Sequence, residues 1–279
     1  MIWRCRDRSF DLSARTLVMG VVNVTPDSFS DGGRYFAPGA AVAHARQLLA
    51  EGADLLDLGA ESTRPGAPPV TVAEQLRRLV PVLEALAADP RVCVAVDTSS
   101  AEVAARALEL GARVVNDVTA LADPGMAAVV THGGAGLVLM HMAGTPATMQ
   151  RDPRYEDVTL AVCRHLAGRR DAAVEAGVPA ECVALDPGIG FGKTVQHNLE
   201  LLARLQELDG LGRPLLVGVS RKSFLGRTLD LPVDQRLEGG LAATAVAVFL
   251  GARVVRTHDV AATLRAVRVA DALRAARRA

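Results

Sequence analysis

Short apolar runs recur along the chain, and each is long enough to form one β-strand. They lie at residues 17–22, 55–58, 92–96, 113–115, 136–140, 182–185, 215–219 and 253–255. The runs are rich in Val and Leu and are mainly continuous, without regular alternation of apolar and polar residues. Continuous runs of this length are typical of parallel strands that are buried on both faces.

A helical segment is predicted after each of these runs. The eight segments are 38–51, 71–88, 101–110, 124–130, 157–176, 195–207, 235–250 and 260–275. Glycine follows several of them, as at Gly52, Gly111 and Gly177, and this residue is common just past a helix end. A strand followed by a helix, eight times, predicts a single-domain (β/α)8 TIM barrel that spans residues 1–279. A doubly wound open sheet can arise from the same alternation, although the count of eight favours the barrel.

Polar and ionisable residues follow nearly every predicted strand. In a barrel of this kind the active site lies at the carboxyl ends of the strands. The residues at those ends are Asn23, Glu61, Thr63, Arg64, Asp97, Asn116, His141, Asp186, Lys222, Arg256 and His258. Any one of Asp97, Asn116 and Asp186 could instead cap the helix that follows it. Because they converge in one ring, we favour a binding pocket.

Composition narrows the choice of partner and compartment. The formal net charge is +0, which argues against nucleic acid as a partner, because phosphate binding needs a basic excess. No apolar run approaches the length that spans a bilayer, and the first residues lack the apolar core of a signal peptide. We therefore expect no membrane contact and a cytoplasmic location. The four cysteines are scattered without a CxxC pair, so neither zinc nor a disulfide framework is indicated.

The segment 23–33 directly follows the first predicted strand and has neither helical nor strand periodicity. It contains one proline, two glycines and a single aromatic residue, Phe29. Irregular connections of this length are often functional, although such a cluster of turn residues can also form an ordinary turn. We expect a lid that closes over the pocket when ligand is bound.

Two further segments suggest ligand contacts. The glycine-rich stretch DPGIGFGKT (186–194) lacks the glycine that a Walker A loop needs at Pro187, so we interpret it as a turn where a flat ligand approaches the backbone. Arg256 and His258 precede the last helix, where barrels often bind phosphate, and Arg64 supplies a second guanidinium. The alternative is that both arginines pair with surface carboxylates.

These motifs together resemble the dihydropteroate synthase family of the folate pathway. The motifs are NVTPDSFSDGG (23–33), ESTRPG (61–66), VDT (96–98), NDV (116–118), MHM (140–142), GTP (144–146), DPGIGFGK (186–193), SRKS (220–223) and RTH (256–258). The family condenses 6-hydroxymethyl-7,8-dihydropterin diphosphate with p-aminobenzoate and releases diphosphate. The resemblance implies the barrel fold, a requirement for Mg²⁺, small-molecule substrates that sulfonamide-type analogues could mimic, and a homodimer.

The resemblance also implies a role for individual residues. The pterin site comprises Asp97, Asn116, Val118, Met140, Asp186, Lys222 and Arg256. The diphosphate site comprises Asn23, Arg64, Arg256 and His258, and Asn23 offers the one side-chain oxygen expected for Mg²⁺. The p-aminobenzoate site comprises Phe29, Thr63, Pro65, Phe191 and Ser223. The catalytic set comprises Asp97, Lys222, Arg256, Phe29 and Asp31.

The residue types suit a reaction in which leaving-group departure is the difficult step. The aromatic amine is neutral at pH 7, so no strong general base is needed. The arginines, Mg²⁺ and a helix N-terminus are expected to stabilise diphosphate as it departs. We expect an SN1-like path in which Asp97 faces the developing cation. Two alternatives remain at this stage, a pterin-binding methyltransferase module and a non-catalytic pterin-binding paralogue.

Overall fold

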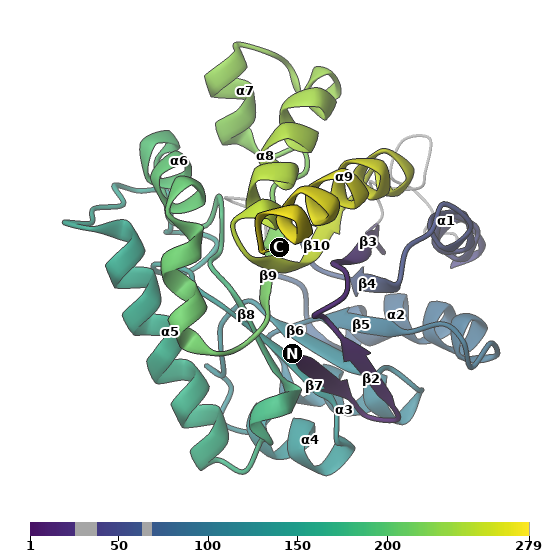
Figure 1. Cartoon of the computed structure of the whole chain (residues 1–279). Helices are drawn as coiled ribbons and strands as arrows, with labels where there is room; N and C mark the ends of the chain where they lie inside the picture. The colour runs from purple at the N-terminus through teal and green to yellow at the C-terminus, as the bar shows by residue number, and fades with distance from the viewer. Residues whose placement is uncertain (26–37, 63–68, 279) are drawn as a thin grey trace.

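The computed structural model describes residues 1–25, 38–62 and 69–278. Eight parallel strands form a closed barrel in the order β10-β3-β4-β5-β6-β7-β8-β9 (Figure 1). The strands are β3 (Leu17–Asn23), β4 (Leu55–Gly59), β5 (Val94–Asp97), β6 (Val114–Asp117), β7 (Gly136–Met140), β8 (Val183–Asp186), β9 (Leu215–Gly218) and β10 (Ala252–Thr257). Closure of the barrel confirms the predicted fold and rules out the doubly wound sheet.

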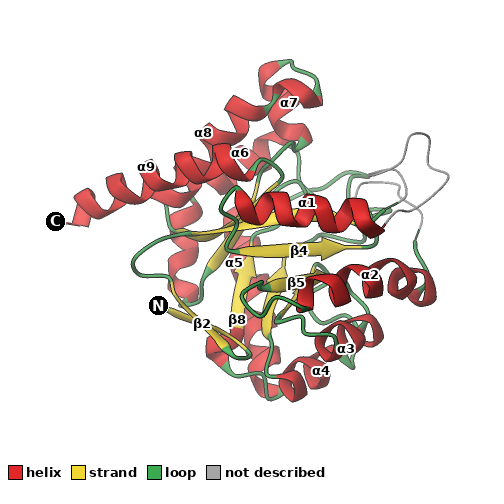
Figure 2. Cartoon of the chain, turned by 90° about the vertical axis from the view of Figure 1, so that its right-hand side faces the viewer, coloured by secondary structure: helices red, strands yellow, loops and turns green. Residues whose placement is uncertain are grey.

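The helices lie outside the barrel and cover its strands (Figure 2). Those predicted from the sequence are α1 (Pro38–Ala50), α2 (Val72–Ala87), α3 (Ala101–Glu109), α4 (Met126–Gly133), α5 (Val158–Glu175), α6 (Val195–Ala203), α8 (Leu237–Phe249) and α9 (Val260–Arg278). Short 3-10 segments lie at Ala180–Cys182, Leu205–Leu211 and Val233–Gln235. None of the helices in the described part of the chain is long and apolar enough to cross a membrane.

Two regular elements were not predicted. One is α7 (Ser223–Leu229), which directly follows the SRK segment after β9. The other is an antiparallel hairpin of β1 (Ile2–Cys5) and β2 (Arg8–Asp11), which lies across one end of the barrel (Figure 1). Trp3 is fully buried there and donates from Nε1 to the carbonyl of Cys182 at 2.9 Å. The hairpin therefore closes the amino end of the barrel, opposite the ends where the polar residues lie.

Side chains of each strand alternate between the helices and the barrel interior. The inward positions of the lower layer are apolar and pack with the hairpin: Leu55, Ala95, Val114, Val138, Ala184, Leu216 and Val254. Two residues further along these strands, the inward position is Asp57, Asp97, Asn116, Met140, Asp186, Gly218 or Arg256, and the residue level with Asp57 on β3 is Val21. The interior is thus apolar at its amino end and mostly polar at its carboxyl end, which is where a polar ligand can enter.

Candidate active site

A hydrogen-bonded network crosses the carboxyl end of the barrel. The carboxylate of Asp57 on β4 accepts from Asn116 Nδ2 at 3.0 Å and from Arg256 Nε at 2.5 Å. The same guanidinium donates from Nη2 to Asp97 Oδ2 at 3.0 Å. Strands β4, β5, β6 and β10 are therefore joined through their side chains, and three of the four residues were predicted to bind a pterin.

Asp57 was missed by the reasoning from sequence. The predicted site residues directly follow the apolar runs, whereas Asp57 lies inside a run, between Leu56 and Leu58. The period of two was the available signal, because Leu55 faces the interior and Asp57 follows it by two positions. Its side chain is completely buried, so its partners Asn116 and Arg256 compensate for the loss of water.

The charges of this network shift each other's ionisation. Burial, and then the negative charge of Asp57, raise the pKa of Asp97 to about 7, although Arg256 opposes the shift. Burial disfavours the charge on Arg256, but Asp57 and Asp97 outweigh it and raise the pKa of that guanidinium. Burial also raises the pKa of Asp186, against the opposing charge of Lys222. Arg256 is therefore a fixed cation near Asp97 and Asp186, two carboxyl groups whose pKa values are raised.

Two acceptor atoms in the network have no hydrogen-bond partner among the described residues. They are Asp57 Oδ1 and Asn116 Oδ1, and both are buried. Buried acceptors are rarely left unpaired, because the loss of hydration is then uncompensated. Acceptors at this position suit a ligand that brings N–H donors on a flat edge, as a pterin does.

The structure rules out helix capping as the role of Asp97, Asn116 and Asp186. The helices that follow their strands begin at other N-cap residues, which are Ser100, Gly125 and Thr194. Pairing of Arg256 with a surface carboxylate is also excluded, because its carboxylate partners are the interior residues Asp57 and Asp97.

The glycine-rich turn after β8 brings Asp186, Phe191 and Lys222 together. Asp186 Oδ1 accepts from the amide of Gly188 at 2.7 Å, and Lys222 donates to the carbonyl of Ile189. The Lys222 ammonium also lies 4.5 Å from the centre of the Phe191 ring. A Cβ at Gly188 would meet the carbonyl oxygen of His141 at 1.8 Å, so only glycine fits this turn.

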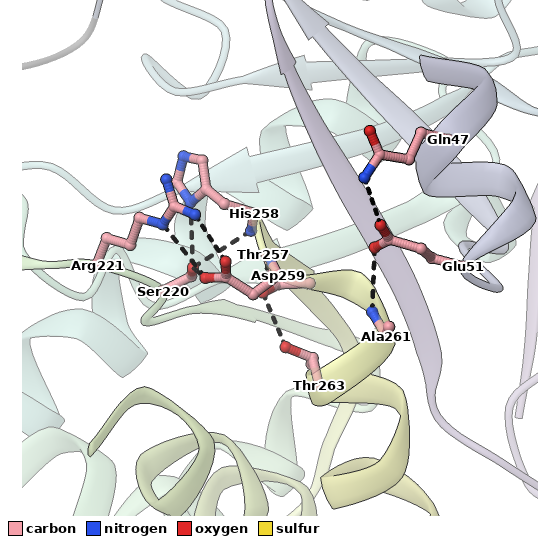
Figure 3. Close-up of polar contacts among 9 residues, drawn as sticks. All are labelled: Gln47, Glu51, Ser220, Arg221, Thr257, His258, Asp259, Ala261 and Thr263. Atoms are coloured by element: carbon pink, nitrogen blue, oxygen red, sulfur yellow. Dashed lines mark hydrogen bonds and ion pairs between the residues drawn. The ribbon is translucent and has the colours of Figure 1, made fainter. Parts of the chain in front are cut away.

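His258 and Ser220 form the adjoining end of the site (Figure 3). Ser220 Oγ lies 3.1 Å from His258 Nδ1 and accepts from the backbone amide of His258 at 3.2 Å. Arg221 pairs with Asp259 at 2.6 Å. These contacts join the loop after β9 to the loop after β10.

Two backbone amides at the start of α9, one just before the helix and one within it, donate to side chains of the protein. Thr257 Oγ1 accepts from the Asp259 amide at 3.1 Å, and Glu51 accepts from the Ala261 amide at 3.3 Å (Figure 3). The contribution of this helix N-terminus to diphosphate binding stays a prediction. Arg256 and His258 are the side chains predicted to bind an anion at this end of the site.

The chain matches proteins of known activity over most of its length. A sequence model of the pterin-binding enzyme family matches residues 19–258. The dihydropteroate synthase of Escherichia coli K12 is 46% identical over 264 residues, which cover 95% of this chain and 93% of the relative. The Yersinia pestis dihydropteroate synthase, in complex with a sulfonamide drug, superimposes with a TM-score of 0.92 at 43% identity, covering 99% of this chain and all of that one.

The Xanthomonas albilineans dihydropteroate synthase with 4-aminobenzoic acid gives a TM-score of 0.91 at 46% identity and covers 98% of each chain. The chain belongs to the dihydropteroate synthase family. It is a transferase that condenses 6-hydroxymethyl-7,8-dihydropterin diphosphate with p-aminobenzoate to give 7,8-dihydropteroate and diphosphate.

The other positions expected in a dihydropteroate synthase fall in three groups. Val118 directly follows β6 and Met140 ends β7, and both are buried. Asn23 is half-buried at the end of β3, and Ser223 is exposed at the start of α7. The positions Phe29, Asp31, Thr63, Arg64 and Pro65 lie outside the described residues, and so does most of the expected lid.

Proposed function

We propose that this dihydropteroate synthase works by a dissociative path, with the pterin held in the carboxyl end of the barrel. The observation that carries the proposal is the buried network of Asp57, Asn116, Arg256 and Asp97. It offers unpaired acceptors for the ring edge and negative charge beside the ring. An analogue without the matching donors would leave these buried groups unpaired, which supports steep selectivity.

The network suits a step in which the bond from the methylene carbon to the diphosphate oxygen breaks before the amine attacks. Positive charge then develops on the pterin methylene and spreads into the ring. Asp97, which is 9% exposed, supplies a negative charge that needs no reorganisation as the cation forms. Arg256 orients Asp97 and faces the departing diphosphate, and His258 supports the same anion.

The described residues offer Mg²⁺ few protein ligands at this site. The described residues include no group of three or more His, Cys, Asp or Glu side chains that could hold a metal ion. Asn23 at the end of β3 offers one side-chain oxygen, and Mg²⁺ commonly takes few protein ligands together with substrate phosphates. When bound there, Mg²⁺ supplies positive charge that stabilises the leaving diphosphate.

The amine site is proposed around Phe191 and Ser223, with Phe29, Thr63 and Pro65 completing it. Phe191 contacts Lys222, which also holds the turn after β8, so the aromatic ring borders the pterin pocket. The 4-aminobenzoic acid bound by the Xanthomonas albilineans relative supports a site for this amine.

We further propose a homodimer in the cytoplasm. Large apolar side chains are exposed on the adjacent helices α8 and α9: Val246 is 50% exposed, Val269 62% and Leu273 58%. Exposed apolar groups on packed neighbouring helices suit a subunit interface. The four cysteines are all unpaired, which fits a reducing compartment. Sedimentation equilibrium of the wild type and of Leu273→Glu tests the dimer, and a monomeric wild type would contradict it.

Diphosphate release tests the assigned reaction. The enzyme is mixed with the pterin diphosphate, Mg²⁺ and p-aminobenzoate, and each substrate is omitted in turn. We expect 7,8-dihydropteroate only in the complete mixture, with one diphosphate released for each product molecule. A protein that binds the pterin without forming this product would contradict the proposal.

A further inference from the structure

Lys193 is buried at the end of the turn that follows β8. Its side chain is 3% exposed, unusual for a lysine. Its ammonium contacts the carbonyl of Gly188 at 2.9 Å, the carbonyl of Phe191 at 3.0 Å and Nδ1 of His141 at 2.9 Å. A protonated lysine has three N–H donors, so each donor is matched to one acceptor.

Burial shifts the ionisation of both His141 and Lys193. Burial, followed by the charge of Lys193 and then by His165, lowers the pKa of His141 to about 2, so the imidazole stays neutral. A neutral ring can offer Nδ1 as an acceptor. Burial lowers the pKa of Lys193 to about 7, while the nearby charge of Asp186 favours the protonated form.

The two carbonyls that Lys193 holds mark the two ends of the turn. Gly188 begins it, next to the amide that binds Asp186, and Phe191 ends it, with its ring against the ammonium of Lys222. Gly188 and Gly190 both have positive φ, at 66° and 84°, so the turn is a conformation that few other residues adopt. Lys193 and Lys222 thus bind carbonyls of the same turn.

We propose that Lys193 is a positioning residue for the aromatic amine, because it fixes the backbone that carries the Phe191 ring. Its ammonium makes no hydrogen bond to Asp57, Asp97, Asn116 or Arg256, so it should affect amine binding more than pterin binding. This inference rests on the proposed amine site at Phe191. It adds a residue that acts through the backbone, without contact to either substrate.

The test is the variant Lys193→Met, which keeps the length of the side chain but removes its charge and donors. Loss of a charge-assisted hydrogen bond predicts that KM for p-aminobenzoate rises about tenfold or more. KM for the pterin diphosphate should change by less than about threefold, because Asp97 and Asn116 are untouched. A purely structural lysine would instead lower the thermal midpoint and leave both KM values unchanged.

Tyr155→Phe is the matched control. The hydroxyl of Tyr155 donates to the carbonyl of Gly192 at 2.8 Å, in the same loop but beyond Phe191. Its loss should lower stability slightly without a selective change in KM for p-aminobenzoate. Equal changes in both KM values of Lys193→Met, or no change in either, would overturn the proposal.

A second variant covers the case in which Lys193→Met does not fold. Lys193→Ala leaves space for n-butylammonium, which should restore a low KM for p-aminobenzoate, whereas tetramethylammonium, which has no N–H donor, should not. Equal effects of both cations would also reject the role of Lys193. The wild-type assay separates this proposal from the assigned reaction, because a wild type without amine-dependent diphosphate release rejects the reaction itself.

Discussion

Replacement of Asp97 by asparagine tests the charge that the site provides. The carboxylate lies at the end of β5, is 9% exposed and contacts Arg256 Nη2 at 3.0 Å. Asparagine has nearly the same shape and can still accept from Arg256, so the main change is the loss of one negative charge. Because burial and Asp57 disfavour that charge in the empty protein, the variant should be at least as stable as the wild type.

The size of the effect follows from the distance and the medium. Across about 6 Å, in an effective dielectric of about 20, two unit charges attract each other by about 3 kcal/mol. That energy is present when the pterin cation forms and largely absent when the neutral ring binds. We therefore expect turnover to fall about a hundredfold, while pterin affinity changes by less than about threefold.

The assay measures the rate of a single turnover and, separately, the equilibrium affinity for a pterin without a leaving group. Asn116→Ala is the contrasting control, because it removes a ring-edge contact without a change of charge. It should weaken pterin binding more than it slows the chemical step. If Asp97→Asn lowers affinity and turnover equally, or lowers neither, the argument from charge is refuted.

Three other predictions follow from the network and the hairpin. Because the pKa of Asp97 is about 7, kcat/KM for the pterin substrate should fall as pH drops through about 7, and Asp97→Asn should lack this inflection. The contribution of Asp97 to stability should fall as pH rises from about 4 to about 7, because the carboxyl group loses its proton at lower pH in the unfolded chain than in the folded protein. Asp57→Ala removes one of the two carboxylate partners of Arg256 and leaves only Asp97, so it should lower the free energy of unfolding by about 3 kcal/mol, measured in urea. Trp3→Ala should lower it by about 3–5 kcal/mol with kcat unchanged, because the hairpin is distant from the site.

Most of the fold could be predicted because the eight strands are apolar on both faces. The hairpin was missed because each strand has four residues and only Trp3 and Cys5 of β1 face the core. Its turn also lacks a hairpin signal, since Arg6 takes the positive φ of 61° that glycine or asparagine usually adopts. The helix α7 was missed because it has seven residues, too few to show a helical period.

The site was predicted where its residues follow the strands and was incomplete where they lie within them. Asp97, Asn116, Asp186 and Arg256 were found because they terminate apolar runs. Asp57 has an apolar residue on each side, so only the alternation of inward and outward positions distinguishes it. The role of Lys193 depends on the path of the backbone between Gly188 and Phe191, which no local pattern in the sequence encodes.

The most direct test of the dissociative path is the secondary deuterium isotope effect at the pterin methylene. The substrate carries deuterium on the carbon that bears the diphosphate, and the rate of a single turnover is compared with that of the unlabelled compound. A path in which the carbon–oxygen bond breaks first predicts a normal effect, clearly above unity, that does not depend on p-aminobenzoate concentration. An effect close to unity, together with no bond cleavage in the absence of the amine, would contradict it.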